Sequence, residues 1–355
     1  MTGLPRLGER LPSCVGMTAD FRPFSFETQA GRPALIILAH DAPVDVLGDG
    51  LGPMAAAFAA RGADILLLGT EDVVRAAPAG PGWIAVDCGA DFLAGLGVAS
   101  GAVAVLVADR CLRVARAPVV LAGLWPDGLL AEFLAVVTML PVEPARVARA
   151  PAPVLVLPNL LSGAMCAALV ARIDGGDTID GQIAGIGADG APVSRVDHAR
   201  KFRRDLLLPE GDPLQRSLRR DLLAACAPEI ARAFQARITH ADRILLARYD
   251  AGAGWFSRHR DTNAANIAFR EFALSVCLDA EGFEGGEVLF AEYNDHRHAV
   301  PTGAGLIFSA ALLHEVAPVT AGARHVLLTF LHGAAAEERR LAYEARRIAE
   351  QLPAG

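Results

Sequence analysis

This 355-residue sequence lacks paired cysteine motifs, long apolar runs and a surplus of basic charge. Its six cysteines are dispersed, without C-x-x-C or zinc-like spacing, so neither a disulfide framework nor a zinc site is expected. No stretch approaches eighteen uninterrupted apolar residues, which argues against a membrane span. The first residues lack the basic segment and apolar core of a secretory signal, so we expect a cytoplasmic protein. The net charge of −7 argues against a nucleic-acid partner.

The chain has enough apolar material for well-buried cores, since 53% of its residues are hydrophobic. Its length exceeds what one ordinary core holds, which favours two domains. The segment 141–153 is rich in proline and has the composition of a linker. We therefore expect domains at residues 1–140 and 154–335, and a charged helix at 336–355.

The first domain alternates continuous apolar strands with helices, which predicts an α/β layered fold with both sheet faces covered. Its expected strands are Pro33–Ala39, Ile65–Gly69, Trp83–Val86 and Val103–Ala108, and its expected helices are Gly52–Arg61 and Asp127–Leu140.

The second domain begins with helical sequence and then changes to short strands, which indicates an all-β sandwich or barrel with flanking helices. We expect a helix ending near Ile173, a glycine-rich loop from Gly175 to Pro192, and a helix over Leu214–Gln235. The expected strands are Arg243–Tyr249, Phe272–Leu278, Glu287–Phe290, Gly305–Ser309 and His325–Leu331. In the last helix Leu341, Ala345, Ile348 and Leu352 share a face that could pack on the core or on another subunit, which leaves a homodimer open.

Three side chains have the composition of a metal site that activates O2. An iron(II) centre of this kind uses two imidazoles and one carboxylate, and leaves other positions open. His259 and Asp261 stand at i and i+2, a spacing that projects both side chains to one side of a strand. His314 from a later strand would complete the set. The alternative is that these are structural histidines with satisfied hydrogen bonds.

Arg324 follows His314 by ten residues and is expected to open the next strand. Its planar guanidinium can bind a carboxylate through two parallel hydrogen bonds, which a lysine cannot do. Iron(II), one aspartate, a dicarboxylate such as 2-oxoglutarate and one arginine together form a neutral assembly, which lowers the cost of burying them.

Residues 153–333 resemble the 2-oxoglutarate- and Fe(II)-dependent dioxygenases of the prolyl/lysyl hydroxylase type. The resemblance rests on YDAGAGWFSRHRD from Tyr249 to Asp261, on FEGGEVLF over Phe283–Phe290, and on HEVAPVTAGAR from His314 to Arg324. It implies a double-stranded β-helix, or jelly roll, in which His259, Asp261 and His314 bind Fe(II). By the same resemblance Arg324 holds the distal carboxylate of 2-oxoglutarate, Tyr249 lines that pocket, and O2 is the oxidant. Related halogenases have a small residue in place of the carboxylate ligand, so Asp261 favours hydroxylation.

Several polar residues around these motifs are candidates for substrate binding. Arg195 and Arg203 follow the glycine-rich segment, where this family often builds a lid, and a solvated loop is the alternative. The remaining candidates are Asn263, Arg270, His296 and His298, although the two histidines also suit an exposed hairpin. Gly285 and Gly286 are expected to provide turn geometry.

Residues 6 to about 140 resemble a peroxiredoxin-type thioredoxin fold. The resemblance rests on LGERLP from Leu7, FSF from Phe24, GRPALII from Gly31, and VLVADR from Val105. A thiol peroxidase needs a reactive thiolate after the first core strand, and the segment His40–Met54 contains no cysteine. We therefore expect a degenerate domain used for dimerisation or docking rather than a peroxidase.

The leading hypothesis is an oxygenase that hydroxylates an unactivated C–H bond and releases succinate and CO2. The substrate remains open among a free amino acid, a peptide or protein side chain, and a natural-product intermediate. The alternative is a sensor or scaffold that binds iron and 2-oxoglutarate without turnover.

Overall fold

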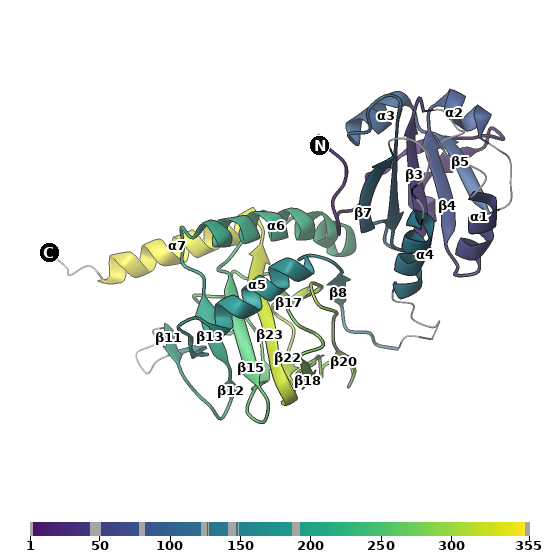
Figure 1. Cartoon of the computed structure of the whole chain (residues 1–355). Helices are drawn as coiled ribbons and strands as arrows, with labels where there is room; N and C mark the ends of the chain where they lie inside the picture. Colours follow the sequence, from purple (N-terminus) through teal and green to yellow (C-terminus); the bar gives the residue numbers. More distant parts are fainter. Residues whose placement is uncertain are drawn as a thin grey trace. The chain divides into compact units, whose positions relative to one another are not determined.

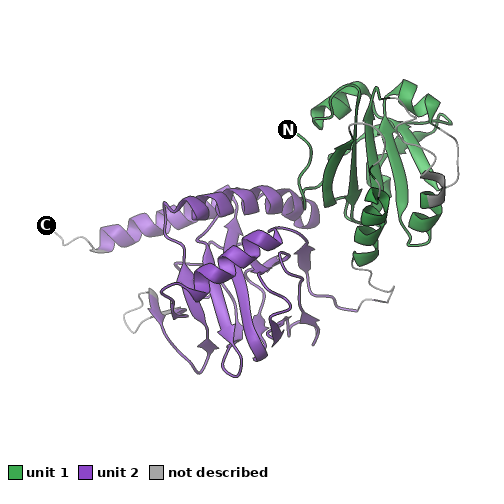
Figure 2. Cartoon of the chain, viewed as in Figure 1, with its two compact units in different colours: residues 1–145 green, residues 146–355 purple. Residues whose placement is uncertain are grey.

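The computed structural model describes residues 3–42, 51–77, 82–121, 126, 128–140, 147, 149–186 and 192–351. The chain divides into two compact units, Met1–Ala145 and Arg146–Gly355 (Figure 2). The predicted linker at 141–153 lies partly outside the described residues, which omit 141–146 and 148.

The first unit is built on a seven-stranded sheet in the order β2-β1-β5-β4-β3-β6-β7 (Figure 1). Its strands are β1 Val15–Thr18, β2 Pro23–Ser25, β3 Ala34–His40, β4 Asp64–Gly69, β5 Trp83–Asp87, β6 Ala102–Ala108 and β7 Val114–Leu121. Strands β3, β4 and β5 are parallel, whereas β6 and β7 are antiparallel.

Every residue of β3 is buried because helices cover both faces of this sheet. Phe58 of α1 (Leu51–Ala59) and Phe133 of α4 (Leu129–Met139) pack on one face. On the other face Phe26 of η1 (Phe26–Gln29) and Leu93 of α3 (Ala90–Gly95) form a second cluster. A further helix, α2, spans Glu71–Ala76. This layering explains why the strands are continuously apolar, as the sequence predicted.

The second unit contains a nine-stranded sheet, a five-stranded sheet and a hairpin (Figure 1). The nine-stranded sheet has the order β8-β21-β17-β23-β15-β13-β9, and β14 and β18 also pair with β23. Its strands are β8 Val154–Leu157, β9 Ile179–Asp180, β13 Arg204–Leu207, β14 His240–Ala241, β15 Leu245–Asp250, β17 Phe272–Cys277, β18 Phe283–Gly285, β21 Gly305–Ser309 and β23 Val319–His332.

The five-stranded sheet has the order β12-β16-β22-β19-β20, and the hairpin joins β10 to β11. The strands of the five-stranded sheet are β12 Lys201–Phe202, β16 Trp255–His259, β19 Val288–Leu289, β20 Arg297–His298 and β22 His314–Val316. The hairpin strands are β10 Ile183–Ile186 and β11 Pro192–Arg195.

Helices cover the outer face of the nine-stranded sheet. Leu169 of α5 (Gly163–Asp174) and Leu222 of α6 (Pro213–Phe234) pack with Leu327 of β23 in the main core of this unit. Burying one such leucine side chain contributes about 1.5–3 kcal/mol. The inner face is joined to the five-stranded sheet by smaller apolar clusters, one of which contains Phe290 and Phe308. The space left between the sheets holds the site.

Two local expectations need correction, and one of the two alternatives for the last helix is excluded. The predicted loop Gly175–Pro192 contains strands β9 and β10, because backbone pairing with β13 and β11 does not depend on apolar side chains; residues 187–191 lie outside the described part. Arg324 does not open its strand, since β23 already begins at Val319. In α7 (Ala334–Gln351) the side chains of Leu341 and Ile348 are exposed rather than packed on the core, and Leu352 lies outside the described residues.

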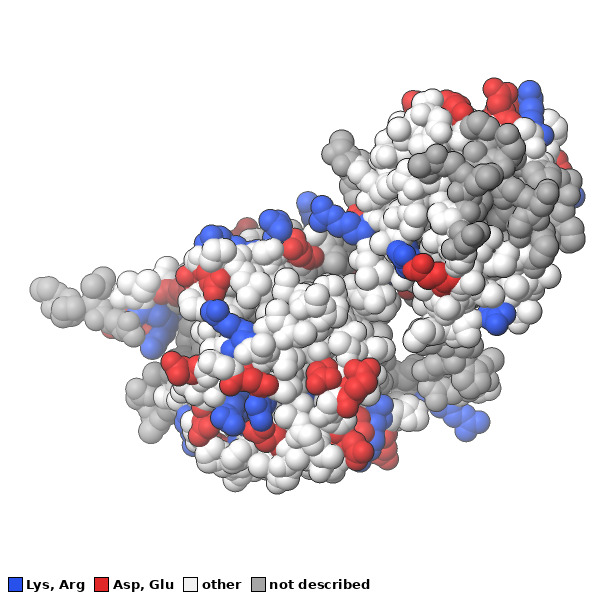
Figure 3. Space-filling model, in the orientation of Figure 1, with Lys and Arg blue, Asp and Glu red and all other residues white. Residues whose placement is uncertain are grey.

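The surface of the second unit carries both signs of charge. On the face drawn in Figure 3, Lys and Arg side chains are interspersed with Asp and Glu side chains. Among the helices that the structure describes, none combines the length and the apolar character that crossing a membrane requires.

Candidate metal and co-substrate site

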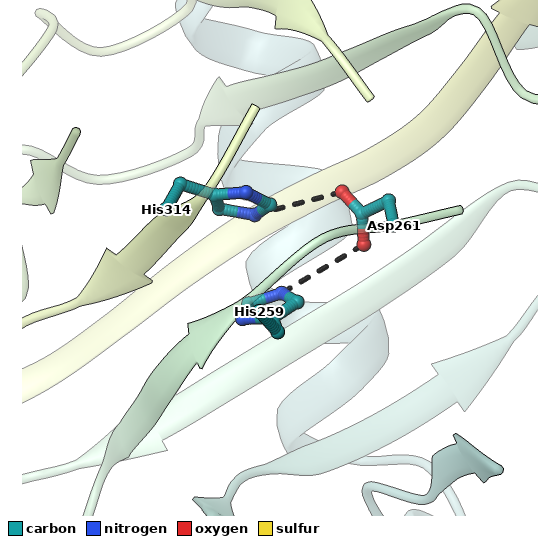
Figure 4. Close-up of side chains that lie close together, drawn as sticks. All are labelled: His259, Asp261 and His314. Atoms are coloured by element: carbon teal, nitrogen blue, oxygen red, sulfur yellow. Dashed lines mark ion pairs between the residues drawn. The ribbon is translucent and has the colours of Figure 1, made fainter. Parts of the chain in front are cut away.

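Two histidines and one aspartate converge at the inner face of the five-stranded sheet (Figure 4). His259 ends β16 and His314 begins β22, and the two residues are direct partners across these antiparallel strands. The Nε2 atoms of His259 and His314 lie 3.7 and 3.5 Å from the two carboxylate oxygens of Asp261. All three candidate ligand atoms lie within 4.8 Å of one another.

Asp261 reaches this position from the turn after β16 rather than from the strand itself. Its backbone N–H donates to the carbonyl of Ala310 at 2.9 Å, which anchors the turn beside the connection that leads to His314. The side chains of His259 and Asp261 therefore lie together, as their i, i+2 spacing predicted. The carboxylate is positioned by the hydrogen bond of the turn, however, and not by the alternation of side chains along a strand.

Backbone carbonyls orient both imidazoles for metal binding. The Nδ1 of His259 lies 2.7 Å from the carbonyl oxygen of Ser257, and the Nδ1 of His314 lies 3.0 Å from that of Leu312. Because a carbonyl only accepts, each Nδ1 carries the proton and each Nε2 presents a lone pair. Burial and the neighbouring His314 lower the pKa of His259 to about 3, so its ring is neutral at physiological pH.

The donor set fits a divalent metal ion. Two imidazole nitrogens and one carboxylate surround a common point, and the contacts between them are too long for strong hydrogen bonds. This is the two-histidine, one-carboxylate arrangement that suits iron(II) and leaves coordination positions open.

Arg324 lies buried in the same cavity, with 7% of its surface exposed. It faces Tyr249 across the β15–β23 pair, and its guanidinium carbon lies 5.1 Å from the centre of the tyrosine ring. Among the described residues, no carboxylate forms an ion pair with it. Burial lowers the pKa of Arg324, but an arginine starts so high that it stays cationic at neutral pH. A buried cation of this kind is suited to an anionic ligand.

Arg203 occupies the other side of Tyr249, and its Nη1 donates to the tyrosine hydroxyl at 3.2 Å. Unlike Arg324, it is neutralised: its Nε and Nη2 donate to the two oxygens of Asp205 at 2.5 and 2.8 Å. Tyr249 and Asp205 accordingly raise the pKa of Arg203. The structure therefore gives Arg203 a role in holding Tyr249 in place.

These groups line one cavity of about 620 Å³ between the two sheets. Two of the other predicted substrate residues, Asn263 and Arg270, also line it. Arg270 is buried, donates to Asp242 through Nε and Nη2, and stacks on Phe330 with its guanidinium carbon 3.6 Å from the ring centre.

Three predicted substrate residues lie elsewhere. Arg195 is exposed on β11, where its Nη2 lies 3.6 Å from Asp197. His296 is exposed and does not line the cavity. His298 lines a smaller cavity of about 190 Å³, which shares Arg324 with the main cavity.

Gly285 and Gly286 have positive φ angles of 77° and 68°, as expected for turn glycines. Gly286 also makes room for the candidate co-substrate residue: a Cβ atom there would lie 2.6 Å from the Cδ of Arg324.

The residues of the cavity wall that the sequence reasoning missed include two charged ones, Asp205 and Arg243. The spacing of Arg203 and Asp205 at i and i+2 in an extended segment was the available signal for their ion pair. Arg243 stands six residues before Tyr249, an even spacing that places both on one face of an extended chain.

Two cysteines of the first unit, Cys14 and Cys88, do not have the properties of reactive thiols. Burial raises the pKa of Cys14 to about 11 and that of Cys88 to about 12, so both are protonated at neutral pH. The segment where a peroxidase cysteine was sought, His40–Met54, lies partly outside the described residues and contains no cysteine.

Comparison with known proteins identifies relatives of the second unit. The sequence model of the 2OG-Fe(II) oxygenase superfamily matches residues 244–332. A PKHD-type hydroxylase of Stenotrophomonas maltophilia (strain K279a) is 30% identical over 177 residues, which cover 47% of this chain and 73% of the relative. A PKHD-type hydroxylase of Janthinobacterium sp. (strain Marseille) is 28% identical over 211 residues, 56% of this chain and 87% of the relative.

Solved structures similar to this chain include two prolyl hydroxylases. The Trichoplax adhaerens prolyl hydroxylase, solved with a peptide fragment of hypoxia inducible factor, has 16% sequence identity and a TM-score of 0.41. That likeness covers 54% of this chain and 86% of the other. A Pseudomonas putida prolyl-4-hydroxylase has 17% identity and a TM-score of 0.39, over 52% of this chain and 94% of the other.

Proposed function

Because this chain belongs to the 2OG-Fe(II) oxygenase superfamily and is an Fe(II)- and 2-oxoglutarate-dependent hydroxylase, we propose that His259, Asp261 and His314 hold its iron. We assign the distal carboxylate of 2-oxoglutarate to Arg324 and the adjoining wall of that pocket to Tyr249. The reaction converts a C–H bond, O2 and 2-oxoglutarate into an alcohol, succinate and CO2.

The observation that carries this assignment is a buried arginine in the same cavity as the metal ligands, with no carboxylate partner in the described part of the chain. The metal ion brings two positive charges, Asp261 one negative charge, and 2-oxoglutarate two negative charges. Arg324 supplies the remaining positive charge, so the complete assembly is neutral. This balance matters because an uncompensated charge is costly in a site shielded from water.

Iron(II) with 2-oxoglutarate and O2 supplies the oxidising power, while the protein positions the reactants and shields them. The Ser257 and Leu312 carbonyls keep the two imidazole Nε2 atoms directed at the metal position. Arg203 holds the Tyr249 hydroxyl, and Tyr249 in turn packs against Arg324. Apolar side chains such as Val288 and Phe308 line the cavity and limit the access of water.

The substrate is proposed to offer an unactivated C–H bond in a free amino acid, a peptide or protein side chain, or a natural-product intermediate. A cavity of about 620 Å³ accommodates the co-substrate together with a small substrate or one side chain of a larger one.

For the first unit we propose a degenerate peroxiredoxin-like thioredoxin fold that serves docking or dimerisation. Support comes from the layered α/β sheet, in which three parallel strands adjoin an antiparallel pair. The protonated state of Cys14 and Cys88 is consistent with the loss of thiol chemistry.

Anaerobic addition of Fe(II) and 2-oxoglutarate tests the assigned residues. We expect a weak visible charge-transfer band in the wild-type protein, its loss in His259→Ala, and a requirement for much higher 2-oxoglutarate in Arg324→Ala. His198→Ala is the matched control, since His198 is half exposed and lies outside the cavity. An unaltered band and unaltered iron binding in His259→Ala would contradict the assignment.

A further inference from the structure

The main cavity has different residues at its two ends along strands β15 and β23. Tyr249 and Arg324 are cross-strand partners towards one end of the paired segment, and Leu245 pairs with Leu328 nearer the other. Arg243 precedes β15 by two residues and also lines the cavity. Six residues of extended chain separate Arg243 from Tyr249, or roughly 20 Å at about 3.3 Å per residue. A molecule of 2-oxoglutarate bound to Arg324 is much shorter than that distance, so Arg243 is available to a different ligand.

Positive charge accumulates on the cavity wall beyond what the protein neutralises. Apart from Arg324, the lining cations are Arg200, Lys201, Arg203, Arg243, Arg260 and Arg270. The carboxylates that pair with them are Asp205, shared by Lys201 and Arg203, Asp242 with Arg270, and Glu292 with Arg260. Up to three positive charges therefore remain in excess, and the neutral assembly of iron, Asp261, 2-oxoglutarate and Arg324 does not remove them.

Arg243 is one of the cations that contribute to this excess of positive charge. Among the residues that the structure describes, no carboxylate pairs with it. It lies close enough to Lys201 and Arg270 to repel both: burial lowers the pKa of each, and Arg243 lowers each further. Arg243 is itself exposed, but its charge repels the two buried cations, and an anion bound beside it would relieve this repulsion.

The cavity wall that includes Arg243 also contains groups that can orient such a ligand. Arg270 is buried and held by Asp242 and Phe330, so its position is fixed. Asn266 also lines the cavity, and its buried Oδ1 has no hydrogen-bond partner. A buried amide oxygen without a donor is costly, and a ligand that carries an N–H or O–H donor beside its anionic group would satisfy it.

We propose that the substrate of this hydroxylase carries a carboxylate, and that Arg243 binds this carboxylate at the end of the cavity opposite Arg324. The inference rests on the proposed function, because it takes the other end of the cavity as the 2-oxoglutarate site. A carboxylate suits the planar fork of an arginine better than other anions of one charge. The substrate class is then an acidic amino acid or a peptide with an acidic side chain.

Substrate-stimulated succinate release tests the inference with probes whose side chains are anionic, neutral and cationic. The probes are L-glutamate, L-glutamine and L-lysine, each as the free amino acid and within the same short peptide. The wild-type protein is compared with Arg243→Gln, Arg243→Lys and Arg243→Glu. Arg220→Gln is the matched control, because Arg220 is an exposed arginine on α6 outside the cavity.

We expect the glutamate probes to stimulate the wild-type protein most, with the free and peptide forms showing which source of carboxylate is used. Loss of a charge-assisted contact should reduce kcat/KM for these probes roughly 10- to 100-fold in Arg243→Gln. Arg243→Lys should retain part of the activity, and Arg243→Glu should favour the lysine probes. Calorimetric binding of the best glutamate probe under nitrogen should weaken by a similar factor in Arg243→Gln, which provides a readout without turnover.

Equal stimulation by the glutamate, glutamine and lysine peptides, in which only one side chain changes, would overturn the inference. So would an equal loss for all probes in Arg243→Gln, or the absence of any response to glutamate in a wild-type protein that binds Fe(II) and 2-oxoglutarate. If the wild-type protein shows neither the charge-transfer band nor iron-dependent succinate, the assigned metal and co-substrate site fails instead. The two failures are therefore distinguishable.

Discussion

Replacing Gly286 with alanine should weaken 2-oxoglutarate binding although it leaves every residue assigned to a ligand contact in the sequence. A Cβ atom at this position would lie 2.6 Å from the Cδ of Arg324 and 3.0 Å from a methyl carbon of Val319. Because the arginine side chain is more easily moved than the backbone, the guanidinium should be displaced. Losing a bidentate contact of about 1.5–3 kcal/mol corresponds to a roughly 10- to 100-fold rise in the KM for 2-oxoglutarate.

Backbone strain also contributes to this variant and needs its own control. Gly286 has a φ of +68°, where alanine costs roughly 1–2 kcal/mol in stability. Gly252 has a φ of +76°, but a Cβ atom there would meet nothing within 4 Å. Gly252→Ala should therefore lower the melting temperature through the same strain and leave the KM for 2-oxoglutarate unchanged.

A double-mutant cycle identifies Arg324 as the group through which Gly286→Ala acts. In an Arg324→Ala background the added methyl group has no guanidinium to displace, so the second substitution should cost little further 2-oxoglutarate affinity. The measurements are the 2-oxoglutarate dependence of succinate formation and thermal unfolding of all variants. The reasoning is refuted if Gly286→Ala and Gly252→Ala have the same KM, or if the Gly286 effect is fully retained without Arg324.

Three further outcomes follow from buried and charged groups. Asp205→Asn leaves two buried cations without their carboxylate and should lower the free energy of unfolding by about 3–5 kcal/mol; a loss below about 1 kcal/mol in urea denaturation would contradict this. Hydrogen bonds from Arg340 and His332 lower the pKa of Glu337 to about 2, so the stability that Glu337 contributes is present above its unfolded pKa of about 4.3 and is lost as pH falls towards 2. The stability difference between wild type and Glu337→Gln should thus shrink over that range, and a constant difference would refute the assignment. Cys88, whose pKa is about 12, should resist iodoacetamide at pH 8 while the exposed Cys111 reacts, as mass spectrometry of digested protein can show; equal labelling would count against this reasoning.

The candidate metal site was predictable because its signal is local in sequence. His259 and Asp261 are separated by one residue, and the strand Gly305–Ser309 before His314 was predicted with its observed bounds. The hydroxylase reaction inferred from this pattern is confirmed by the family match and the curated relatives. The roles of the individual residues stay predictions.

Other features depend on which strands become neighbours, and the sequence does not show this. The surroundings of Arg243 follow from the placement of β12 and β13, which bring Lys201 and Asp205 into the same cavity. Strands β9 and β10 were missed because their pairing depends on backbone hydrogen bonds in a segment without a clear apolar pattern. The apolar residues of α7 were recognised, but helical periodicity cannot tell whether such a face is covered.

Two pairs of facing residues on neighbouring strands determine where the chain of this enzyme tolerates an insertion or a deletion. His259 pairs with His314 in one sheet, and Tyr249 pairs with Arg324 in the other. The ten residues from His314 to Arg324 therefore connect the strand pairing of one sheet to the strand pairing of the other. One residue added within β23 before Arg324 would turn its guanidinium to the opposite face of the sheet and abolish its place in the cavity. Sequence length is thus as strictly constrained as residue identity in this segment of the chain.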